Sequence, residues 1–266
     1  MFDIFVKRKK IVIDFITTDA HVYTHAKPLR AHKVLPQWFL DLQKSYIKYH
    51  PEDPNLYTTE ATIKKCPGII DLYYRSIAMT SWFDAEMDIH SNGDVTVRRG
   101  VGELIINEHP REQFEPFVAE TRARNLKIDS PWAIKCNRDI KILVTEPTWH
   151  SYQFHNSLSV MPGVTQPRYT WATNINYITR PSSETKTLFF EPGDPLAIFT
   201  PITEDDFEIK HHVVPEYEAV RRGVFVPKWG VKVSDDKPPT REYGIRYHRR
   251  IVDKLKKLYG EDNSDE

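Results

Sequence analysis

Between residues 127 and 201 the chain divides into short segments rich in β-branched and aromatic residues, each ended by Pro, Gly, Asn or Asp. Segments of this length and spacing are typical of the strands of a β sandwich or barrel. The strands that this pattern predicts are 128–136, 140–147, 152–162, 171–179, 187–190 and 195–200. We therefore expect a mainly β fold, an antiparallel sandwich or barrel, with peripheral helices at both ends.

The composition is that of a folded chain without a charge bias. Of 266 residues, 40% are hydrophobic, which is ample for a core. The 37 basic and 37 acidic residues cancel, so the whole chain has no electrostatic attraction for nucleic acid or an anionic membrane. The apolar run 11–16 is too short for a signal peptide or a membrane span, and Cys66 and Cys136 are too few for a disulfide scaffold. We expect a soluble protein inside the cell.

The N-terminal region, residues 1–59, is predicted to pack a strand and a helix on the β core. Residues 11–16 form the strand. The helix is expected over 35–50, because Trp38, Phe39, Leu42 and Tyr46 follow one another at spacings of three and four.

The β domain itself is predicted to span residues 60–214 and to end in an edge strand, Phe207–Val213. A further short helix is expected within it at 110–124. The C-terminal extension, residues 215–266, begins with one or two helical turns over 215–222 and ends in an acidic tail.

A hairpin is predicted around Gly93, with strand 77–89 running into the turn Ser91-Asn92-Gly93. A two-residue Asn-Gly loop would mix polar and apolar side chains on each face. A three-residue loop with Gly93 in the left-handed region instead pairs Ile89 with Val95 and Met87 with Val97, and it sets Glu86 opposite Arg98 and Asp88 opposite Thr96. This second register gives one dry face and one wet face, and we favour it for that reason.

The polar face of that strand carries the candidate metal ligands. Alternation places Asp84, Glu86, Asp88 and His90 on one side, and carboxylates with a histidine are suitable ligands for a divalent ion. The alternative is the solvated face of a two-sided sheet, with Glu86 paired to Arg98. We favour this alternative, because successive positions on one face are about 6.5 Å apart along a strand.

The sequence shows no pattern that predicts catalysis or a cofactor. A His followed two positions later by Asp, Glu or His is half of the iron-binding triad of jelly-roll oxygenases. The one such pair in this sequence, His50 and Glu52, falls in the turn Pro51-Glu52-Asp53-Pro54 and not on a predicted strand. The Gly-x-Ser-x-Gly, Gly-x-x-x-x-Gly-Lys and Gly-x-Gly-x-x-Gly motifs are missing. We therefore expect no catalytic residues, no cofactor and no metal.

A basic amphipathic helix is predicted over residues 240–259. Its apolar stripe is expected to dock on the β domain and leave a cluster of positive side chains exposed for a partner. A solvated face with no partner is the alternative. The candidate partner-binding residues are Arg246, Arg249, Arg250, Lys254 and Lys257.

Several short segments of the sequence resemble those of a poorly characterised protein family of tailed (T4-like, marine) bacteriophages. These segments include Cys66-Pro67-Gly68, Met161-Pro162-Gly163-Val164 and Glu191-Pro192-Gly193-Asp194-Pro195, and the resemblance covers residues 60–205. It implies an accessory or virion-associated protein that acts in the host cytoplasm or in the virion. The expected partner is a host or virion protein or a second copy of the chain, and nucleic acid is a less favoured partner.

The segment Gly193-Asp194-Pro195-Leu196-Ala197-Ile198 is also similar to the closing strand of dUTPase-like β-barrels. This similarity implies a β-clip or dUTPase-like barrel and leaves a jelly-roll-like sandwich open. That family's Asp-x-Asp-Tyr segment is replaced here by residues 165–169, Thr-Gln-Pro-Arg-Tyr, and its glycine-rich tail is missing. A non-enzymatic binding protein is therefore the favoured function, and a nucleotide-handling enzyme on such a barrel is the alternative.

Overall fold

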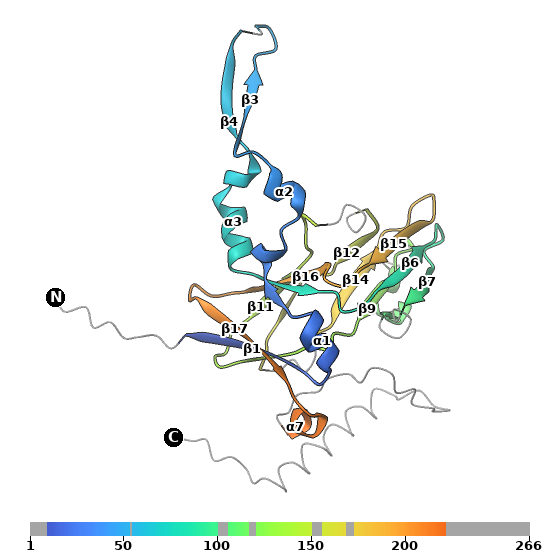
Figure 1. The fold of residues 1–266 in the computed structure, drawn as a ribbon. Coiled ribbons are helices and arrows are strands. Elements are labelled where there is room, and N and C mark those ends of the chain that lie inside the picture. Colours follow the sequence, from blue (N-terminus) through green and yellow to red (C-terminus); the bar gives the residue numbers. More distant parts are fainter. Residues whose placement is uncertain are drawn as a thin grey trace, which may run out of the picture.

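The computed structural model describes residues 10–53, 55–100, 106–116, 121–150, 156–168 and 173–221. Within these residues the chain is mainly β, with short helices between the strands (Figure 1). The strands are β1 Ile11–Thr17, β2 Leu29–Arg30, β3 Ser45–Tyr49, β4 Tyr57–Ala61, β5 Ile77–Thr80, β6 Ala85–Ile89, β7 Val95–Gly100, β8 Ile106–Glu108, β9 Asn125–Ile128, β10 Ala133–Cys136, β11 Ile142–Thr145, β12 Leu158–Val160, β13 Gly163–Thr165, β14 Ile175–Thr179, β15 Lys186–Phe190, β16 Pro195–Pro201 and β17 Phe207–Val213. The helices are α1 Ala20–His25, α2 Gln37–Asp41, α3 Pro67–Tyr74 and α7 Glu216–Arg221, with 3-10 turns η1 Ala31–Val34, η2 Ile63–Lys65 and η3 Arg111–Gln113.

Four sheets build the body of the molecule. Their strand orders are β10-β1-β17, β13-β11-β16-β5-β2, β12-β14-β9-β8 and β15-β6-β7. Strands β1 and β17 pair in parallel, and the other pairs between described strands are antiparallel. None of the described sheets closes on itself, so the expected mainly β antiparallel fold is confirmed in its sandwich form.

A single hydrophobic core joins the four sheets. It combines buried side chains of β1, β5, β6, β9, β14 and β16, among others. Trp132 is 1% exposed, packs edge-on against Phe15, and donates its indole N–H to the carbonyl of Ala26 at 3.0 Å. The hydroxyl of Tyr177 is likewise satisfied inside the core, because it donates to the carbonyl of Leu196 at 2.6 Å. Burial raises the pKa of Tyr177, so this donor stays protonated.

The predicted strands are confirmed at β1, β11, β15, β16 and β17, where short β-rich segments lie between turn residues. Two long predicted strands are wrong because the chain changes sheet within them. The segment 77–89 divides into β5 and β6, and 128–136 divides into the end of β9 and β10. The boundary expected at residue 60 does not separate β1 from the β domain, since β1 is the central strand of its sheet.

The hairpin register is confirmed near the turn and wrong at its far end. Ile89 pairs with Val95, Met87 with Val97 and Asp88 with Thr96, and Gly93 has a φ of 91° as expected. A bulge between Glu86 and Met87 then shifts the pairing, so that Glu86 lies opposite residue 99 and not residue 98.

The structure corrects one of the two internal helix predictions. The segment 35–50 contains the short α2 and then turns into strand β3, so its aromatic spacing does not belong to one helix. Over 110–124 the described residues include η3 and the helical positions 115, 116 and 121, whereas 117–120 lie outside the described residues, so the helix expected there stays a prediction. Helical turns at 215–222 are confirmed as α7.

Residues 31–76 form an excursion between two strands that are hydrogen-bonded neighbours, β2 and β5. We call this segment the insertion. The β3–β4 hairpin of the insertion projects away from the sandwich, and α2 and α3 lie at its base (Figure 1).

Candidate functional site

The insertion is anchored to the body at its neck. Its two ends meet where the Ala31 amide donates to the Ser76 carbonyl at 2.9 Å. Tyr73 is 4% exposed and packs with Ala31 and Ile198 in a small second core. Burial raises the pKa of Tyr73 to about 12. These contacts hold the first and last turns of the insertion against β16 and β5.

The base of the hairpin is tied to the helices below it. The indole of Trp38 on α2 donates to the carbonyl of Trp149 at 3.0 Å, and the two rings lie 5.9 Å apart. At the point where the hairpin begins, the Thr62 amide donates to the Lys44 carbonyl at 3.1 Å, and the Lys64 ammonium donates to the carbonyl of Leu40. The hairpin is therefore held in a defined direction and is not a free loop.

The register of β3 and β4 gives the hairpin two different faces. Ser45 pairs with Ala61, Ile47 with Thr59 and Tyr49 with Tyr57, so these residues share one face. That list contains no charged side chain. We call it the charge-free face, and its members are Ser45, Ile47, Tyr49, Tyr57, Thr59 and Ala61.

The opposite face carries the hairpin's polar network. Tyr46 donates to a Glu60 carboxylate oxygen at 2.9 Å, and the Lys48 ammonium lies 3.3 Å from the other oxygen. The hydrogen bond to Glu60 raises the pKa of Tyr46, and the same bond lowers the pKa of Glu60. The charges on this face are thus paired within the hairpin, and neither strand contributes an unpaired charge to the charge-free face.

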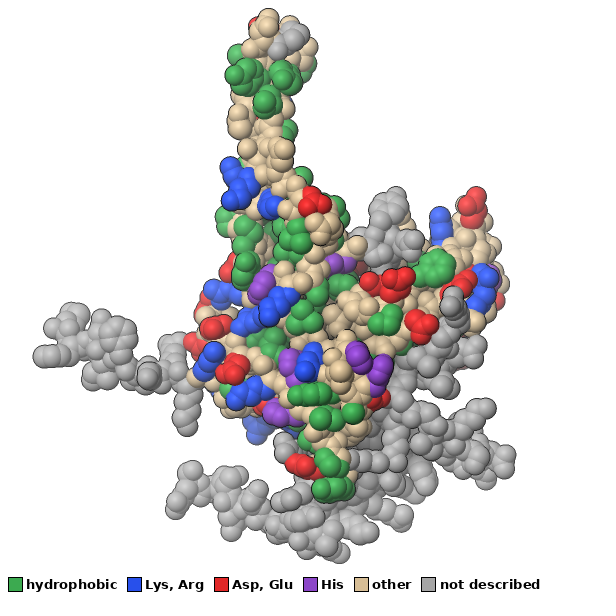
Figure 2. Space-filling model, viewed as in Figure 1, with side chains coloured by type: hydrophobic (Ala, Val, Ile, Leu, Met, Phe, Trp, Pro, Cys, Tyr) green, Lys and Arg blue, Asp and Glu red, His purple; other side chains and the backbone are tan. Residues whose placement is uncertain are grey.

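Large hydrophobic side chains are exposed mainly on the insertion. Among described residues, ten of the fifteen exposed large hydrophobic side chains lie between residues 38 and 74. On the hairpin, Tyr49 and Tyr57 are each 60% exposed and Ile47 is 53% exposed. Figure 2 shows hydrophobic side chains along the projection and Lys or Arg side chains where it joins the body. Scattered exposed hydrophobic residues are normal, but a cluster on one element marks an interaction surface.

Both edges of the hairpin also present backbone groups. The bonds from the His50 amide to the Leu56 carbonyl and from Thr62 to Lys44 place residues 44, 50, 56 and 62 in hydrogen-bonded pairs. Because such pairs alternate along an antiparallel ladder, the N–H and C=O groups of 45, 47 and 49, and of 57, 59 and 61, point outward. An edge of this kind is a template for pairing with another strand.

The predicted metal ligands do not converge. Asp84 is exposed, whereas Asp88 is 3% exposed and accepts hydrogen bonds from Thr187, at 2.7 Å, and from Arg98. Arg98 also lies 3.8 Å from Glu86. Burial alone would raise the pKa of Asp88, but the bonds from Thr187 and Arg98 outweigh it and lower that pKa.

His90, the fourth predicted ligand, is held by two threonine hydroxyls, at 3.0 Å from Thr96 and 3.4 Å from Thr185. Within the described residues, no group of three or more His, Cys, Asp or Glu side chains is arranged to hold a metal ion. Glu86, Asp88 and His90 make contacts across the strands of the β15-β6-β7 sheet, whereas Asp84 lies before β6 begins. Asp88 is a buried anchor, which corrects the expected fully solvated face.

The predicted basic cluster at Arg246, Arg249, Arg250, Lys254 and Lys257 lies outside the described residues, and its role stays a prediction. Within the described part of the chain, no helix is both long and apolar enough to cross a membrane. Cys66 and Cys136 are both free thiols.

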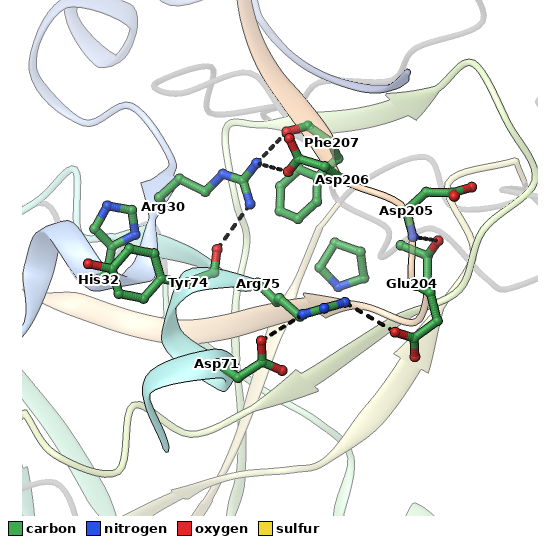
Figure 3. A pocket seen from close by; sticks show the side chains of 11 residues that line it. Arg30, His32, Asp71, Tyr74, Arg75, Glu204, Asp205, Asp206 and Phe207 are labelled. Carbon is green, nitrogen blue, oxygen red and sulfur yellow. Dashed lines mark hydrogen bonds and ion pairs between the residues drawn. The ribbon is translucent and has the colours of Figure 1, made fainter. Parts of the chain in front are cut away.

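A cavity of about 400 Å³ lies between the insertion and the start of β17 (Figure 3). Arg30 lies 3.1 Å from Asp206 and packs over the ring of Phe207, while Arg75 lies 2.8 Å from Asp71. The lining contains four Asp or Glu carboxylates and two arginines, and both arginines are already paired. Such a lining repels a phosphate group rather than attracting it.

No protein-family model matches the chain, and searches of curated proteins and of solved structures found no significant match. The exposed residues of the hairpin were not predicted from the sequence as strand residues. Those of β3 lie within the helix predicted over 35–50, and those of β4 lie in a segment for which no helix or strand was predicted. The available signal was the segment 57–61, Tyr-Thr-Thr-Glu-Ala, whose β-rich start follows a proline-containing turn.

Proposed function

We propose that this chain is a non-enzymatic binding protein, a phage-encoded accessory or virion-associated protein, which docks on a protein partner through the insertion. The observation that carries the proposal is the charge-free face of the hairpin, held away from the body with nothing described packing on it. A two-stranded hairpin is at best marginally stable in water by itself. A partner that packs on the exposed face, or that adds a strand to an open edge of the hairpin, supplies the contacts that the hairpin lacks.

A protein partner fits this surface better than nucleic acid does. The charge-free face has aromatic and aliphatic groups, which are the side chains enriched at the centre of protein interfaces. A nucleic-acid site would need unpaired basic side chains along the same surface. Lys48, the one basic residue within the two hairpin strands, lies on the other face and is paired with Glu60.

The alternative, a nucleotide-handling enzyme, has less support from the structure. The cavity beneath the insertion is lined by more carboxylates than arginines, and both of its arginines are paired with carboxylates. A screen for hydrolysis of nucleoside triphosphates separates the two functions. Turnover that a single Asp or Glu substitution abolishes would overturn the binding proposal.

The direct test is a matched pair of triple variants in the infecting phage. One variant carries Ile47→Ser, Tyr49→Ser and Tyr57→Ser, which removes the exposed apolar groups of the charge-free face. The control carries Val164→Ser, Phe189→Ser and Ile202→Ser, which are similarly exposed at 50–57% on the body. We expect only the hairpin variant to lose its captured partner, or its place in purified virions detected by mass spectrometry. Equal loss or equal retention in both variants would contradict the proposal.

A further inference from the structure

We propose that the partner of the hairpin is a second copy of the same chain, and that the two β4 strands pair antiparallel about a two-fold axis through Thr59. This inference rests on the proposed use of the insertion as a docking surface and names its occupant. In this arrangement the two hairpins form one four-stranded sheet in the order β3-β4-β4-β3.

The backbone of β4 fits this pairing. The outward N–H and C=O groups belong to Tyr57, Thr59 and Ala61, which are also the β4 members of the charge-free face. About a two-fold axis at Thr59, the two Thr59 residues face each other, and Tyr57 of each copy faces Ala61 of the other. All three pairs are of the hydrogen-bonded kind, which gives about six new backbone hydrogen bonds.

The charges at the two ends of the hairpin are complementary to each other. Its tip carries Glu52 and Asp53, both exposed, whereas Lys64 and Lys65 lie in η2 immediately after β4. Antiparallel pairing of two β4 strands brings the acidic tip of each copy to the basic base of the other. Opposite charges at these positions favour association and fix the register.

The charges at the tip and at the base of the hairpin do not favour pairing of two copies through β3. A two-fold axis through Ile47 would bring the acidic tip of each copy next to the base that precedes β3, which carries the exposed Asp41 and the exposed Lys44. These two charges cancel, so the acidic tip would gain no net attraction there. The β3 strand also carries Lys48, and lysine on an edge strand is a common protection against pairing.

The shape of the molecule permits this contact. Because the hairpin projects from the sandwich, two antiparallel hairpins place their two bodies at opposite ends of the shared sheet (Figure 1). The interface is isologous, as is usual for two-fold dimers. Pairing of five-residue strands buries less than the roughly 1,200 Å² of a standard stable interface, so we expect a concentration-dependent dimer and not a permanent one.

The first test is sedimentation velocity of the full chain over about three decades of concentration around the micromolar range. Thr59→Pro removes the outward N–H at the axis and leaves the ladder within the hairpin intact. Ser45→Pro is the matched control, because it removes an outward N–H from the β3 edge. We expect dimer formation in the wild type and in Ser45→Pro, and its loss in Thr59→Pro. A wild type that stays monomeric, or a dimer unaffected by Thr59→Pro, would overturn the inference.

The second test does not depend on backbone changes. Glu52→Lys and Lys65→Glu should each weaken self-association roughly tenfold, because each places like charges at both symmetric contacts. An equimolar mixture of the two variants restores opposite charges at both contacts and should associate like the wild type. Failure of the mixture to associate would contradict the two-fold arrangement.

The two proposals fail in different ways. If the chain stays monomeric while the hairpin triple variant still loses its place in virions or its captured partner, the docking function stands and the second copy is not the occupant. If the dimer forms and responds to Thr59→Pro while the triple variant keeps a different partner through the body, self-association stands and docking by the insertion is wrong for that partner.

Discussion

Replacing Asp88 with Asn tests whether this residue is a structural anchor of the β15-β6-β7 sheet. The carboxylate is 3% exposed and accepts bonds from Thr187 and Arg98. The Asn side chain keeps one oxygen that can accept a hydrogen bond. Its NH2 group then faces either the Thr187 hydroxyl or the Arg98 guanidinium, and neither of these donors can bond to it in the same way. A hydrogen bond to a charged group contributes about 1.5–3 kcal/mol. Because Arg98 is 51% exposed and partly screened, we expect a loss of about 1–3 kcal/mol in the free energy of unfolding.

Equilibrium unfolding in urea at pH 7 measures this loss, with Asp84→Asn as the exposed control that should change stability by less than about 0.5 kcal/mol. The pKa of Asp88 is lowered in the folded state, so its contribution is present above the unfolded pKa of about 3.9 and disappears as the pH falls through the folded value. The difference between wild type and Asp88→Asn should therefore shrink below about pH 4. Equal stability of the two at pH 7, or a difference that persists undiminished at pH 2, would refute the reasoning.

Two further substitutions test the packing and the turn. Met87→Ala removes a side chain that is 0% exposed and should lower the free energy of unfolding by about 2–5 kcal/mol, whereas Tyr57→Ser, at 60% exposure, should lower it by less than about 1 kcal/mol in dilute solution. Gly93→Ala should cost more than about 1 kcal/mol, because φ is 91° and the added Cβ would lie 1.9 Å from the carbonyl oxygen of Arg122. Gly163→Ala is the control, since its Cβ would meet nothing within 4 Å. Thermal unfolding of each variant measures these changes in stability. If Tyr57→Ser destabilises the protein as much as Met87→Ala does, the exposure of the hairpin is contradicted.

The strands that could be predicted from the sequence are those whose pattern of apolar and polar residues matches their burial in the fold. β16 is a continuous apolar run and is buried on both faces as an inner strand of its sheet, while β17 shows the mixed pattern of an edge. The turn at Gly93 was predictable because one register alone separates dry from wet side chains. These features depend on neighbours that are close in sequence.

The sequence could not show where strands change sheet or which element projects. The segment 77–89 contains no Pro or Gly that would predict a break, but the chain leaves one sheet after Thr80 and enters another at Ala85. Residues 35–50 have helical spacing through Tyr46, but the ladder to β4 is formed with residues 57–61, and such non-local pairing overrides local propensity. The candidate site was missed because exposure of Tyr49 and Tyr57 follows from the position of the hairpin, not from its sequence.

Site-specific photo-crosslinking tests most directly whether the charge-free face of the hairpin is the docking surface. A photoreactive phenylalanine analogue is placed at Tyr57, with Phe189 on β15, which is 50% exposed, as the control position. Irradiation of the full chain, both purified at high concentration and in the cells that produce it, should give a discrete adduct from position 57 and none from position 189. An adduct from position 189 with none from position 57 would contradict the account.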